Sequence, residues 1–430
     1  MNRLFKLSLI LNGFPINRAL KEFEKIQIAN DKINPMLIFE YHKRHNEFYQ
    51  GFIKHKGLIL EWKDVPIISK SDFQRPLSDL VGSNKVLNLH VHNTSGSSGT
   101  PFFFAKDKFC HAMNWANFDH CLKQHGIEIG RSLQARFYGI PLDGSKYYKE
   151  RFKDFLAGRI RFPVFDLSDK NLGKILHSFR TTKFEYINGY TSSLVVFAKF
   201  LIRKELCLKS ICPTLKVVFP TSEVLDDIDR KTLERAFGVN VANEYGAAEL
   251  DIIAFEDVDS DFVINNKTLF IELLGEDNLP VAPGVEGRVV VTSLYNTAMP
   301  FVRYDLGDRA ILSEKMKNGQ TVIERLVGRT NDIIKLPSGK ISPGLTFYYI
   351  SKKILESGTS LKEFIVKQTQ LDKFELIYVA DSELTDTDKN AIIFSMTEYL
   401  EEGLSCSFIK ANKIERTKAG KLKHFVSELK

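Results

Sequence analysis

Residues 93–101 combine residue types that can bind phosphate. The glycines and hydroxyl residues of this segment are Thr94, Ser95, Gly96, Ser97, Ser98, Gly99 and Thr100. In such a loop the backbone N–H groups can surround phosphate oxygens, and the hydroxyl groups can donate further hydrogen bonds. The segment lacks the Gly-Lys-Ser/Thr ending of a Walker loop and the Gly-x-Ser-x-Gly spacing of a nucleophile elbow. Because a flexible Ser/Gly linker is the alternative, this segment alone leaves both interpretations open.

A second group of chemically useful residues follows a predicted buried strand at residues 239–243. It consists of Glu244, Tyr245, Gly246 and Glu249. In α/β folds, ligands bind at the carboxyl ends of the strands, where an exposed aromatic ring beside a glycine can stack on a nucleotide base. The Glu249 carboxylate can hold a divalent metal ion on phosphate oxygens. The alternative is a strand end with an ordinary surface carboxylate.

Two further segments place charged side chains next to glycines. Asp308 follows Gly307 in a predicted turn, where a carboxylate can accept hydrogen bonds from both hydroxyls of a ribose. Arg329 can then steady ribose or phosphate. Lys421 follows Gly420 near the C-terminus, where its ammonium could reach a reacting phosphate or carboxylate. The alternatives are a β-turn with a surface ion pair, which contributes little, and a solvated basic tail.

The hydrophobic pattern predicts the elements that must position these segments. Residues 1–90 favour helices, and a further helix is expected from Lys106 to about Gln124. Beyond it, short strands alternate with helices of about 12 residues, which predicts βαβ units and a largely parallel sheet. The predicted strands are 133–140, 184–187, 215–219 and 239–243, and the predicted helices are 169–180, 192–204 and 226–237.

The character of the pattern changes after Glu249, where β-type runs alternate with Gly and Pro turns. These runs predict a smaller β-rich subdomain on the α/β body. Residues 331–430 then have the pattern of a small α+β unit. The predicted fold class is therefore α/β, with a large N-terminal domain at 1–330, which includes the β-rich subdomain, and a small C-terminal domain at 331–430.

The composition is that of an ordinary globular protein. Of the 430 residues, 43% are hydrophobic and 26% are charged, which excludes a disordered, collagen-like or disulfide-scaffold protein. The 33 phenylalanines predict a core and a ligand pocket rich in aromatic rings. The net charge of +7 is small for this length. The basic stretch Lys410–Lys430 has no reading motif beside it, so no nucleic-acid partner is expected.

The cysteines and the lengths of the apolar runs indicate in which cellular compartment the protein is expected. The cysteines are Cys110, Cys121, Cys207, Cys212 and Cys406. They form no CxxC pair, which is typical of reduced thiols in a cytosolic protein. Cys110 and Cys121 adjoin histidines, but their helical pattern favours packed core thiols over metal ligands. Residues 7–10 are too short a run for a signal peptide, and no apolar stretch of about 18 residues occurs. We therefore expect a cytoplasmic protein without a membrane span.

The order of these motifs resembles that of the adenylate-forming superfamily of acyl-CoA synthetases, peptide-synthetase adenylation domains and luciferases. The sequence carries, in order, Thr-Ser-Gly-Ser-Ser-Gly-Thr-Pro, Tyr-Gly-Ala-Ala-Glu, Tyr-Asp-Leu-Gly-Asp, Gly-Arg-x-x-Asp and Gly-Lys. The chain looks most like the phenylacetate–CoA ligase branch and the similar capsule-biosynthesis proteins. It is short, and its segment 219–225, with Ser222 and Glu223, is similar to that branch's segment before the Tyr-Gly motif. The resemblance covers about residues 60–430.

The resemblance implies that a carboxylate attacks the α-phosphate of Mg·ATP, giving an acyl-adenylate and pyrophosphate. The small, mobile C-terminal domain then rotates, and a nucleophile such as the thiol of CoA takes the acyl group. In this scheme residues 94–100 hold the β- and γ-phosphates, Tyr245 stacks on adenine, Glu249 binds Mg²⁺, Asp308 binds the ribose hydroxyls, and Arg329 contacts ribose or phosphate. Ser222, Glu223, Glu244 and Gly246 complete the expected nucleotide site. Lys421 stabilises charge that appears in the transition state, between the attacking carboxylate and the ribose-phosphate oxygen.

Three positions depart from the family pattern. They are Phe102 in place of a common lysine, Asn331 beside Asp332 in place of the hinge acid, and Ala247-Ala248 in place of the threonine before the glutamate. None of them removes Glu249, Asp308 or Lys421, so we expect an active enzyme.

The acid pocket is expected between the sheet edge and the helix after the phosphate segment. Phe137, Tyr138 and Gly139 are candidates for its lining, with a place in the core as the alternative. The expected cofactors are ATP and Mg²⁺, and the acceptor is CoA, a carrier-protein thiol or an amine. Capsule polysaccharide assembly is one candidate setting. Two alternatives stay open: transfer of AMP to an acceptor without a thioester, and a nucleotide-binding scaffold whose catalysis has decayed.

Overall fold

The computed structural model describes residues 1–29, 34–54, 57–82, 89–93, 103–139, 144–327, 333–343, 346–347, 350, 361–380, 382–412, 414 and 425–429. They form two compact units. The first unit comprises the described residues of Met1–Thr94, Phe102–Arg131 and Ala242–Gly328, and the second comprises those of Ser132–Val241 and Arg329–Lys430. The predicted domain boundary near residue 330 lies outside the described residues. In the described part of the chain, no helix is long and apolar enough to cross a membrane.

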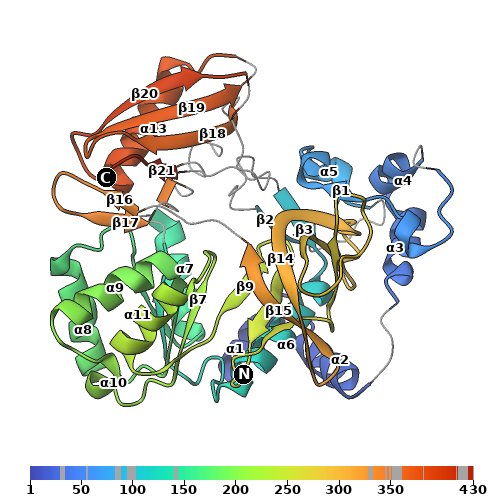
Figure 1. Cartoon of the computed structure of the whole chain (residues 1–430), viewed down its shortest axis with the longest axis horizontal. Coiled ribbons are helices and arrows are strands. Elements are labelled where there is room, and N and C mark those ends of the chain that lie inside the picture. The colour runs from blue at the N-terminus through green and yellow to red at the C-terminus, as the bar shows by residue number, and fades with distance from the viewer. Residues whose placement is uncertain are drawn as a thin grey trace. The chain divides into compact units, whose positions relative to one another are not determined.

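The second unit contains the predicted βαβ region (Figure 1). Its strands are β4 (Gln134–Phe137), β5 (Arg159–Phe162), β6 (Tyr186–Tyr190), β7 (Val217–Thr221) and β8 (Asn240–Val241). They pair in parallel in the order β5-β4-β6-β7-β8. Its helices are α7 (Gly144–Leu156), α8 (Asp169–Thr181), α9 (Thr191–Arg203), α10 (Leu208–Ile211) and α11 (Asp227–Phe237). The predicted parallel sheet is confirmed, with most element ends shifted by a few residues.

Helix α7 and strand β5 were not predicted, because their burial pattern is inverted. Tyr148, Phe152 and Phe155 of α7 are exposed, whereas Asp154 is buried. The Asp154 carboxylate pairs with Arg159 at 2.5 Å and with Arg161 at 2.8 Å, both on β5. Ion pairs therefore hold α7 against β5, and an apolar periodicity could not reveal either element.

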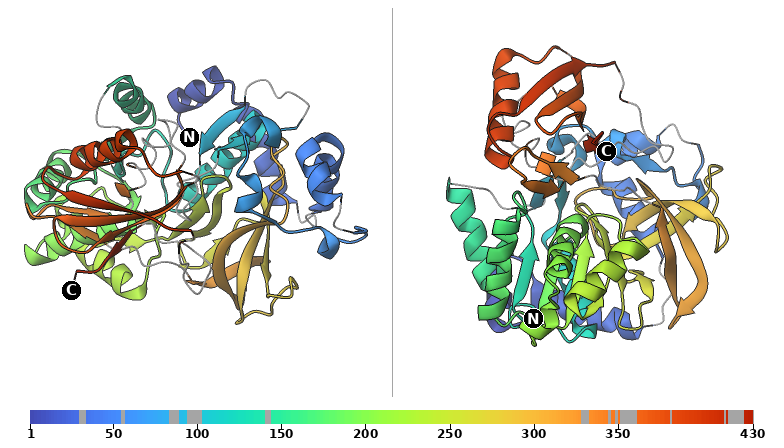
Figure 2. Two further views of the ribbon diagram at one scale, coloured as in Figure 1. Left: turned by 90° about the horizontal axis from the view of Figure 1, so that it is seen from above. Right: turned by 60° about the vertical axis from the view of Figure 1, so that its left-hand side comes forward.

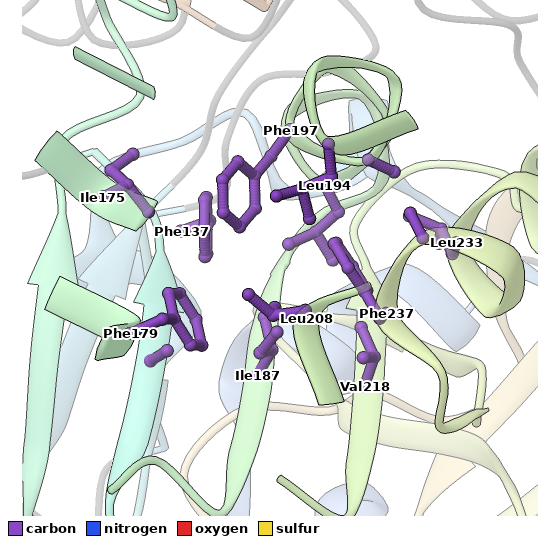
Figure 3. Close-up of a cluster of buried hydrophobic side chains, with 14 of the residues drawn as sticks. Phe137, Ile175, Phe179, Ile187, Leu194, Phe197, Leu208, Val218, Leu233 and Phe237 are labelled. Carbon is purple, nitrogen blue, oxygen red and sulfur yellow. The ribbon is translucent and has the colours of Figure 1, made fainter. Parts of the chain in front are cut away.

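The core of the βαβ region is rich in aromatic rings, as predicted. Phe137 of β4 has its ring centroid 5.5 Å from that of Phe197 on α9. Phe179 of α8 and Phe237 of α11 also lie within 6 Å of Phe197, at 5.9 Å each. Figure 3 shows these rings together with leucine, isoleucine and valine side chains between the helices and the strands.

The first unit contains the predicted β-rich region. Its strands are β9 (Glu244–Ala247), β10 (Asp251–Glu256), β11 (Phe262–Ile264), β12 (Leu269–Leu274), β13 (Glu286–Ser293), β14 (Tyr304–Lys317) and β15 (Gln320–Val327). They run in the order β12-β13-β14-β15-β11-β10-β9 and pair antiparallel. Strand β1 (Ile68–Ser69) pairs parallel with the start of β14. The β-rich subdomain is therefore confirmed.

Helices make up much of the rest of the first unit, as predicted for residues 1–90. The helices are α1 (Arg3–Leu11), α2 (Ile16–Ile28), α3 (Met36–His45), α4 (Glu47–Ile53), α5 (Leu77–Leu80) and α6 (Lys108–Gln124), with short 3₁₀ turns at Trp62–Asp64 and Lys70–Phe73. Strands β2 (His90–Asn93) and β3 (Phe103–Lys106) pair antiparallel. Helix α6 begins two residues later than predicted, because Asp107 caps it by accepting from the N–H groups of Phe109 and Cys110.

The predicted core position of two cysteines on α6 is confirmed. Cys110 and Cys121 are buried and free. Burial raises the pKa of the Cys121 thiol to about 12 and raises that of Cys110 further. Both groups are therefore uncharged, apolar side chains at neutral pH.

The described residues after position 332 have the α+β elements that were predicted for the C-terminal part of the chain. Its sheet has the order β20-β19-β18-β21, and a two-stranded sheet, β16-β17, precedes it. The strands are β16 (Ile333–Lys335), β17 (Ile341–Pro343), β18 (Leu361–Gln368), β19 (Lys373–Ala380), β20 (Ser405–Lys410) and β21 (Phe425–Ser427). Figure 2 shows helix α13 (Asp386–Tyr399) against one face of the four-stranded sheet, where Ile392 and Met396 join its core. The predicted fold class is confirmed.

Candidate functional site

The structure describes part of the predicted site. The phosphate segment Thr94–Thr100, Arg329 and Lys421 lie outside the described residues, as do the departures at Phe102, Asn331 and Asp332. The predicted residues that can be placed are Glu244, Tyr245, Gly246, Glu249 and Asp308 in the first unit, and Ser222, Glu223, Phe137, Tyr138 and Gly139 in the second.

Glu249 lies in the tight turn between β9 and β10. Gly246 of β9 pairs with Ile252 of β10, and the N–H of Leu250 donates to the carbonyl of Ala247 at 3.0 Å. A Cβ atom on Gly246 would lie only 2.4 Å from the backbone oxygen of Asp251, so this close approach requires glycine. The turn leaves the Glu249 side chain buried.

Two tyrosine–carboxylate hydrogen bonds join this hairpin to β14. Tyr304, at the start of β14, donates its hydroxyl to Glu249 Oε1 at 3.0 Å. Tyr245, on β9, donates its hydroxyl to Asp308 Oδ2 at 2.9 Å. The Tyr-Gly-Ala-Ala-Glu motif contains Tyr245 and Glu249, and the Tyr-Asp-Leu-Gly-Asp motif contains Tyr304 and Asp308. The tyrosine of each motif therefore donates a hydrogen bond to the carboxylate of the other motif, about 60 positions away in the sequence.

Both tyrosines are protonated donors at neutral pH. Burial raises the pKa of Tyr304 well above its usual value, and the nearby Glu249 and Asp305 charges raise it further. Burial also raises the pKa of Tyr245, again with the charges of Glu249 and Asp305 adding to the effect. The hydroxyl protons therefore stay available for the two carboxylates.

The segment that precedes Asp308 is anchored in the interior of the first unit. Arg303 is 2% exposed, and its guanidinium donates to the carbonyl oxygens of Lys63 and Val65 at 2.8 Å each. Its Nε donates to the Glu272 carboxylate at 3.2 Å. Asp305 pairs with Arg288 at 2.5 Å. Arg303 and Tyr304 therefore lie in the interior, where Tyr304 begins β14, whereas Gly307 is exposed.

The Glu249 carboxylate fits a magnesium ion that arrives with a nucleotide. Its Oε1 accepts from Tyr304, whereas Oε2 accepts no hydrogen bond from any residue that the structure describes. Among the same residues, no group of three or more His, Cys, Asp or Glu side chains could form a complete protein cage for a metal. Mg²⁺ is commonly held by one or two carboxylates together with substrate phosphates and water. One buried carboxylate, whose Oε2 accepts no hydrogen bond from the described residues, suits that chemistry.

Ser222 and Glu223, the predicted nucleotide-site residues of the second unit, have other surroundings than Glu249. The Glu223 carboxylate accepts from the Ser192 N–H at 2.6 Å and from the Ser192 hydroxyl at 3.0 Å, at the start of α9. Ser222 is exposed and has a left-handed backbone, with φ of 68°. Nucleotide binding by Ser222 and Glu223 stays a prediction.

The three candidates for the acid pocket lie at the end of β4. Phe137 is fully buried in the aromatic core, which favours the core alternative for this residue. The Tyr138 ring is half-buried, 4.4 Å from the Tyr190 ring, with the Arg136 guanidinium 4.2 Å from its centre. The carbonyl of Gly139 accepts from Arg161 at 3.2 Å. A pocket role for Tyr138 and Gly139 stays a prediction.

The sequence did not assign a role to Tyr304 or to Lys106. Tyr304 heads the Tyr-Asp-Leu-Gly-Asp motif, so the motif itself was a usable signal. Lys106 is 2% exposed, and its ammonium pairs with the Asp251 carboxylate. No sequence pattern indicated this pair, because lysine side chains are rarely buried.

Comparison with known proteins shows the fold. No family model matches the chain. The chain is 24% identical over 426 residues to Protein CapK of Staphylococcus aureus, across 91% of this chain and 87% of that protein. It is similar to the structure of 2-hydroxyisobutyryl-CoA ligase in complex with 2-HIB-AMP and CoA in the thioesterification state. That match has a TM-score of 0.53 and 17% identity, over 96% of this chain and 89% of the ligase.

An open conformation of the same ligase, also in complex with 2-HIB-AMP and CoA, gives a TM-score of 0.50 at 17% identity. It covers 90% of this chain and 88% of the ligase. The resemblance to the adenylate-forming enzymes, predicted from the order of the motifs, is therefore confirmed at the level of the fold.

Proposed function

We propose that this chain, which has the fold of the adenylate-forming enzymes, is a Mg·ATP-dependent ligase that activates a carboxylic acid as its acyl-adenylate. Pyrophosphate leaves in the first step. In the second step a thiol or an amine attacks the acyl carbon, and AMP leaves. CoA is a candidate acceptor, because the similar ligase was solved with CoA. A carrier-protein thiol, a phenylacetate–CoA ligase-like preference and a setting in capsule polysaccharide assembly belong to the same proposal.

The observation that carries the proposal is the crossed pair of tyrosine–carboxylate hydrogen bonds. Tyr304 fixes Glu249, and Tyr245 lies with its hydroxyl on Asp308. The side chains expected at the base and at the ribose of one nucleotide are therefore hydrogen-bonded to each other, and the side chain expected at the metal is held by the tyrosine that begins the Asp308 motif. Such a preformed arrangement binds a ligand without ordering these groups first, which lowers the entropic cost of binding.

Each residue then has a defined task in the proposed reaction. Glu249 would hold Mg²⁺, which neutralises phosphate charge while pyrophosphate leaves. Asp308 would accept from the ribose hydroxyls, and the Tyr245 ring would pack on adenine. Lys421 would stabilise the charge that develops as the carboxylate attacks the α-phosphate. Arg329 and the residues of 94–100 would bind the remaining ribose and phosphate oxygens.

ATP–pyrophosphate exchange tests this function without knowledge of the acid. We would offer pools of aryl, hydroxy, fatty and amino acids to the wild type and to Lys421→Ala. Exchange with one pool, lost by about 10²–10³-fold in the variant, is the expected result. A wild type that binds ATP but exchanges with no pool would contradict acyl-adenylate formation from these acid classes.

Two alternatives predict other products. An enzyme that attaches AMP to an acceptor would yield a stable AMP conjugate instead of free AMP with a thioester or amide. A decayed scaffold would bind ATP without turnover, and Lys421→Ala would change nothing. Mass spectrometry of the products separates all three outcomes.

A further inference from the structure

A buried lysine contacts both ends of the turn that carries Glu249. Lys106, the last residue of β3, is 2% exposed. Its ammonium donates to the carbonyl oxygen of Ala248 at 3.1 Å and pairs with the Asp251 carboxylate. Ala248 directly precedes Glu249, and Asp251 lies two residues after it. One ammonium group therefore contacts the chain on both sides of Glu249.

Helix α6 supplies a second donor to the same carboxylate. The side-chain amide of Asn114 donates to Asp251 Oδ2, the oxygen that also pairs with Lys106. Asp251 has φ of 60°, in the left-handed region. That backbone conformation is unfavourable for an aspartate and persists only where its surroundings impose it. The contacts from β3 and α6 provide such surroundings.

The junction between β3 and α6, where Lys106 lies, is fixed by hydrogen bonds to other parts of the first unit. Asp107 caps α6, and its other carboxylate oxygen accepts from the N–H and the hydroxyl of Thr297, at 2.8 and 2.9 Å. The neighbouring Ala105 accepts from the side-chain amide of Asn296 at 3.1 Å. Lys106 thus acts from a fixed point, so its contacts can fix the turn.

Stability alone does not account for a buried ammonium at this place. Removing the Lys106 ammonium from water is costly, and its partner Asp251 keeps 33% of its side chain exposed, so the ion pair repays this cost only in part. A lysine in the interior therefore points to a requirement for a particular geometry. The Lys106 ammonium contacts Ala248 and Asp251, so the geometry that it can fix is that of the turn with Glu249 between them.

We propose that Lys106, Asn114 and Asp251 are positioning residues that hold the Glu249 carboxylate in place for the magnesium ion of Mg·ATP. This inference rests on the proposed function, and it adds residues for which the sequence motifs predicted no role. Together with Tyr304, which contacts Glu249 directly, these residues form the support of a metal ligand. Removing such supporting contacts commonly weakens metal affinity about 10- to 100-fold.

The test measures ATP binding by calorimetry, with Mg²⁺ and with EDTA. In the wild type we expect Mg²⁺ to raise the affinity for ATP. In Lys106→Met we expect the affinity with Mg²⁺ to fall about tenfold, whereas the affinity in EDTA stays unchanged. A loss of folded protein alone would lower the bound fraction equally in both solutions, so the difference between them reports position rather than stability.

Asp119→Asn is a matched control. Asp119 is an aspartate of the first unit, on α6, and its 2% exposed side chain forms ion pairs with the N-terminal amine at 2.9 Å and with Lys123 at 2.8 Å. Its loss should lower the melting temperature without changing the effect of Mg²⁺. If Lys106→Met does not fold, Asn114→Ala carries the test, because it removes one donor to Asp251 and leaves the ion pair between Lys106 and Asp251 in place.

Different results would overturn the metal chemistry and the positioning role. A wild type whose ATP affinity does not respond to Mg²⁺ would overturn the proposed metal chemistry, and the positioning role with it. A wild type that responds, beside Lys106→Met and Asn114→Ala variants that respond equally, would overturn the positioning role only. A reduced Mg²⁺ effect in these variants, with none in Asp119→Asn, is the supporting result.

Discussion

Glu249 in the first unit and Glu223 in the second follow strands in the same way, but their carboxylates have different surroundings. Glu249 accepts one hydrogen bond, from Tyr304, and its Oε2 accepts none from the residues that the structure describes. Both carboxylate oxygens of Glu223 accept from Ser192, at 2.6 Å and 3.0 Å. Ser192 lies in the first turn of α9, where an acidic side chain satisfies an N–H group and interacts favourably with the helix dipole.

The difference separates a ligand-binding carboxylate from one that stabilises a helix start. A glutamate with both oxygens engaged by one serine has little left to offer a metal ion. A glutamate held at one oxygen is oriented, and the other oxygen stays available. A position after a strand is therefore an incomplete criterion for a site, and the hydrogen-bond partners complete it.

The largest effect is expected for Glu249→Gln. Glutamine keeps the size of the side chain and can still accept from Tyr304, but it removes the negative charge that a magnesium ion requires. We expect ATP–pyrophosphate exchange to fall about 10²–10³-fold, with little change in melting temperature. An exchange rate within a few fold of the wild type would contradict a metal-binding role for Glu249 and remove the functional difference between the two glutamates.

A smaller effect is expected for Tyr304→Phe, which removes only the hydroxyl that orients Glu249. The magnesium concentration for half-maximal activity should rise about tenfold, because the carboxylate is no longer held. Tyr49→Phe is the matched control, since the Tyr49 hydroxyl is buried without a hydrogen-bond partner among the described residues. An equal magnesium response in both variants would show that the Tyr304 hydroxyl does not act through Glu249.

Tyr245→Phe should weaken ATP binding by roughly three- to tenfold. The ring that would pack on adenine remains, but Asp308 loses its 2.9 Å hydrogen bond. Tyr245→Leu should weaken binding further, because it also removes the ring. Equal affinities of the phenylalanine and leucine variants, measured by calorimetry, would argue against the stacking role.

The smallest effect on ATP binding is expected for Glu223→Gln. This change weakens the contacts at the start of α9 and should lower the free energy of unfolding by about 1 kcal/mol, with unchanged ATP affinity. Ser192→Ala should have a similar effect, and the double variant little more than either single one. A selective loss of ATP affinity in Glu223→Gln would instead support the nucleotide role predicted from the sequence.

Most elements could be predicted because their burial follows a simple period. Helix α11 was predicted at 226–237 and spans Asp227–Phe237, and it ends at Gly238, which has the left-handed conformation with φ of 69°. Helix α7 and strand β5 were among the elements that were not predicted, because Asp154, Arg159 and Arg161 form buried ion pairs there. Charged side chains in the interior reverse the pattern on which the prediction depends.

The candidate site was predictable in its residue types but not in its contacts. Glu249 and Asp308 were identified from motifs that keep their order along the chain. Their hydrogen bonds to Tyr304 and Tyr245 span 55 and 63 positions, respectively. Such contacts depend on how distant strands are placed in the first unit. The role of Lys106 was hidden for the same reason, since its partner Asp251 is 145 positions away.

ATP–pyrophosphate exchange in the wild type, Glu249→Gln and Glu223→Gln, with the same pools of acids, tests the account most directly. We predict exchange with one acid pool in the wild type, nearly the same rate in Glu223→Gln, and a loss of about 10²–10³-fold in Glu249→Gln. Exchange that survives in Glu249→Gln, or that is lost in Glu223→Gln while the protein stays folded, would contradict the assignment of the nucleotide–metal site to the Glu249 turn.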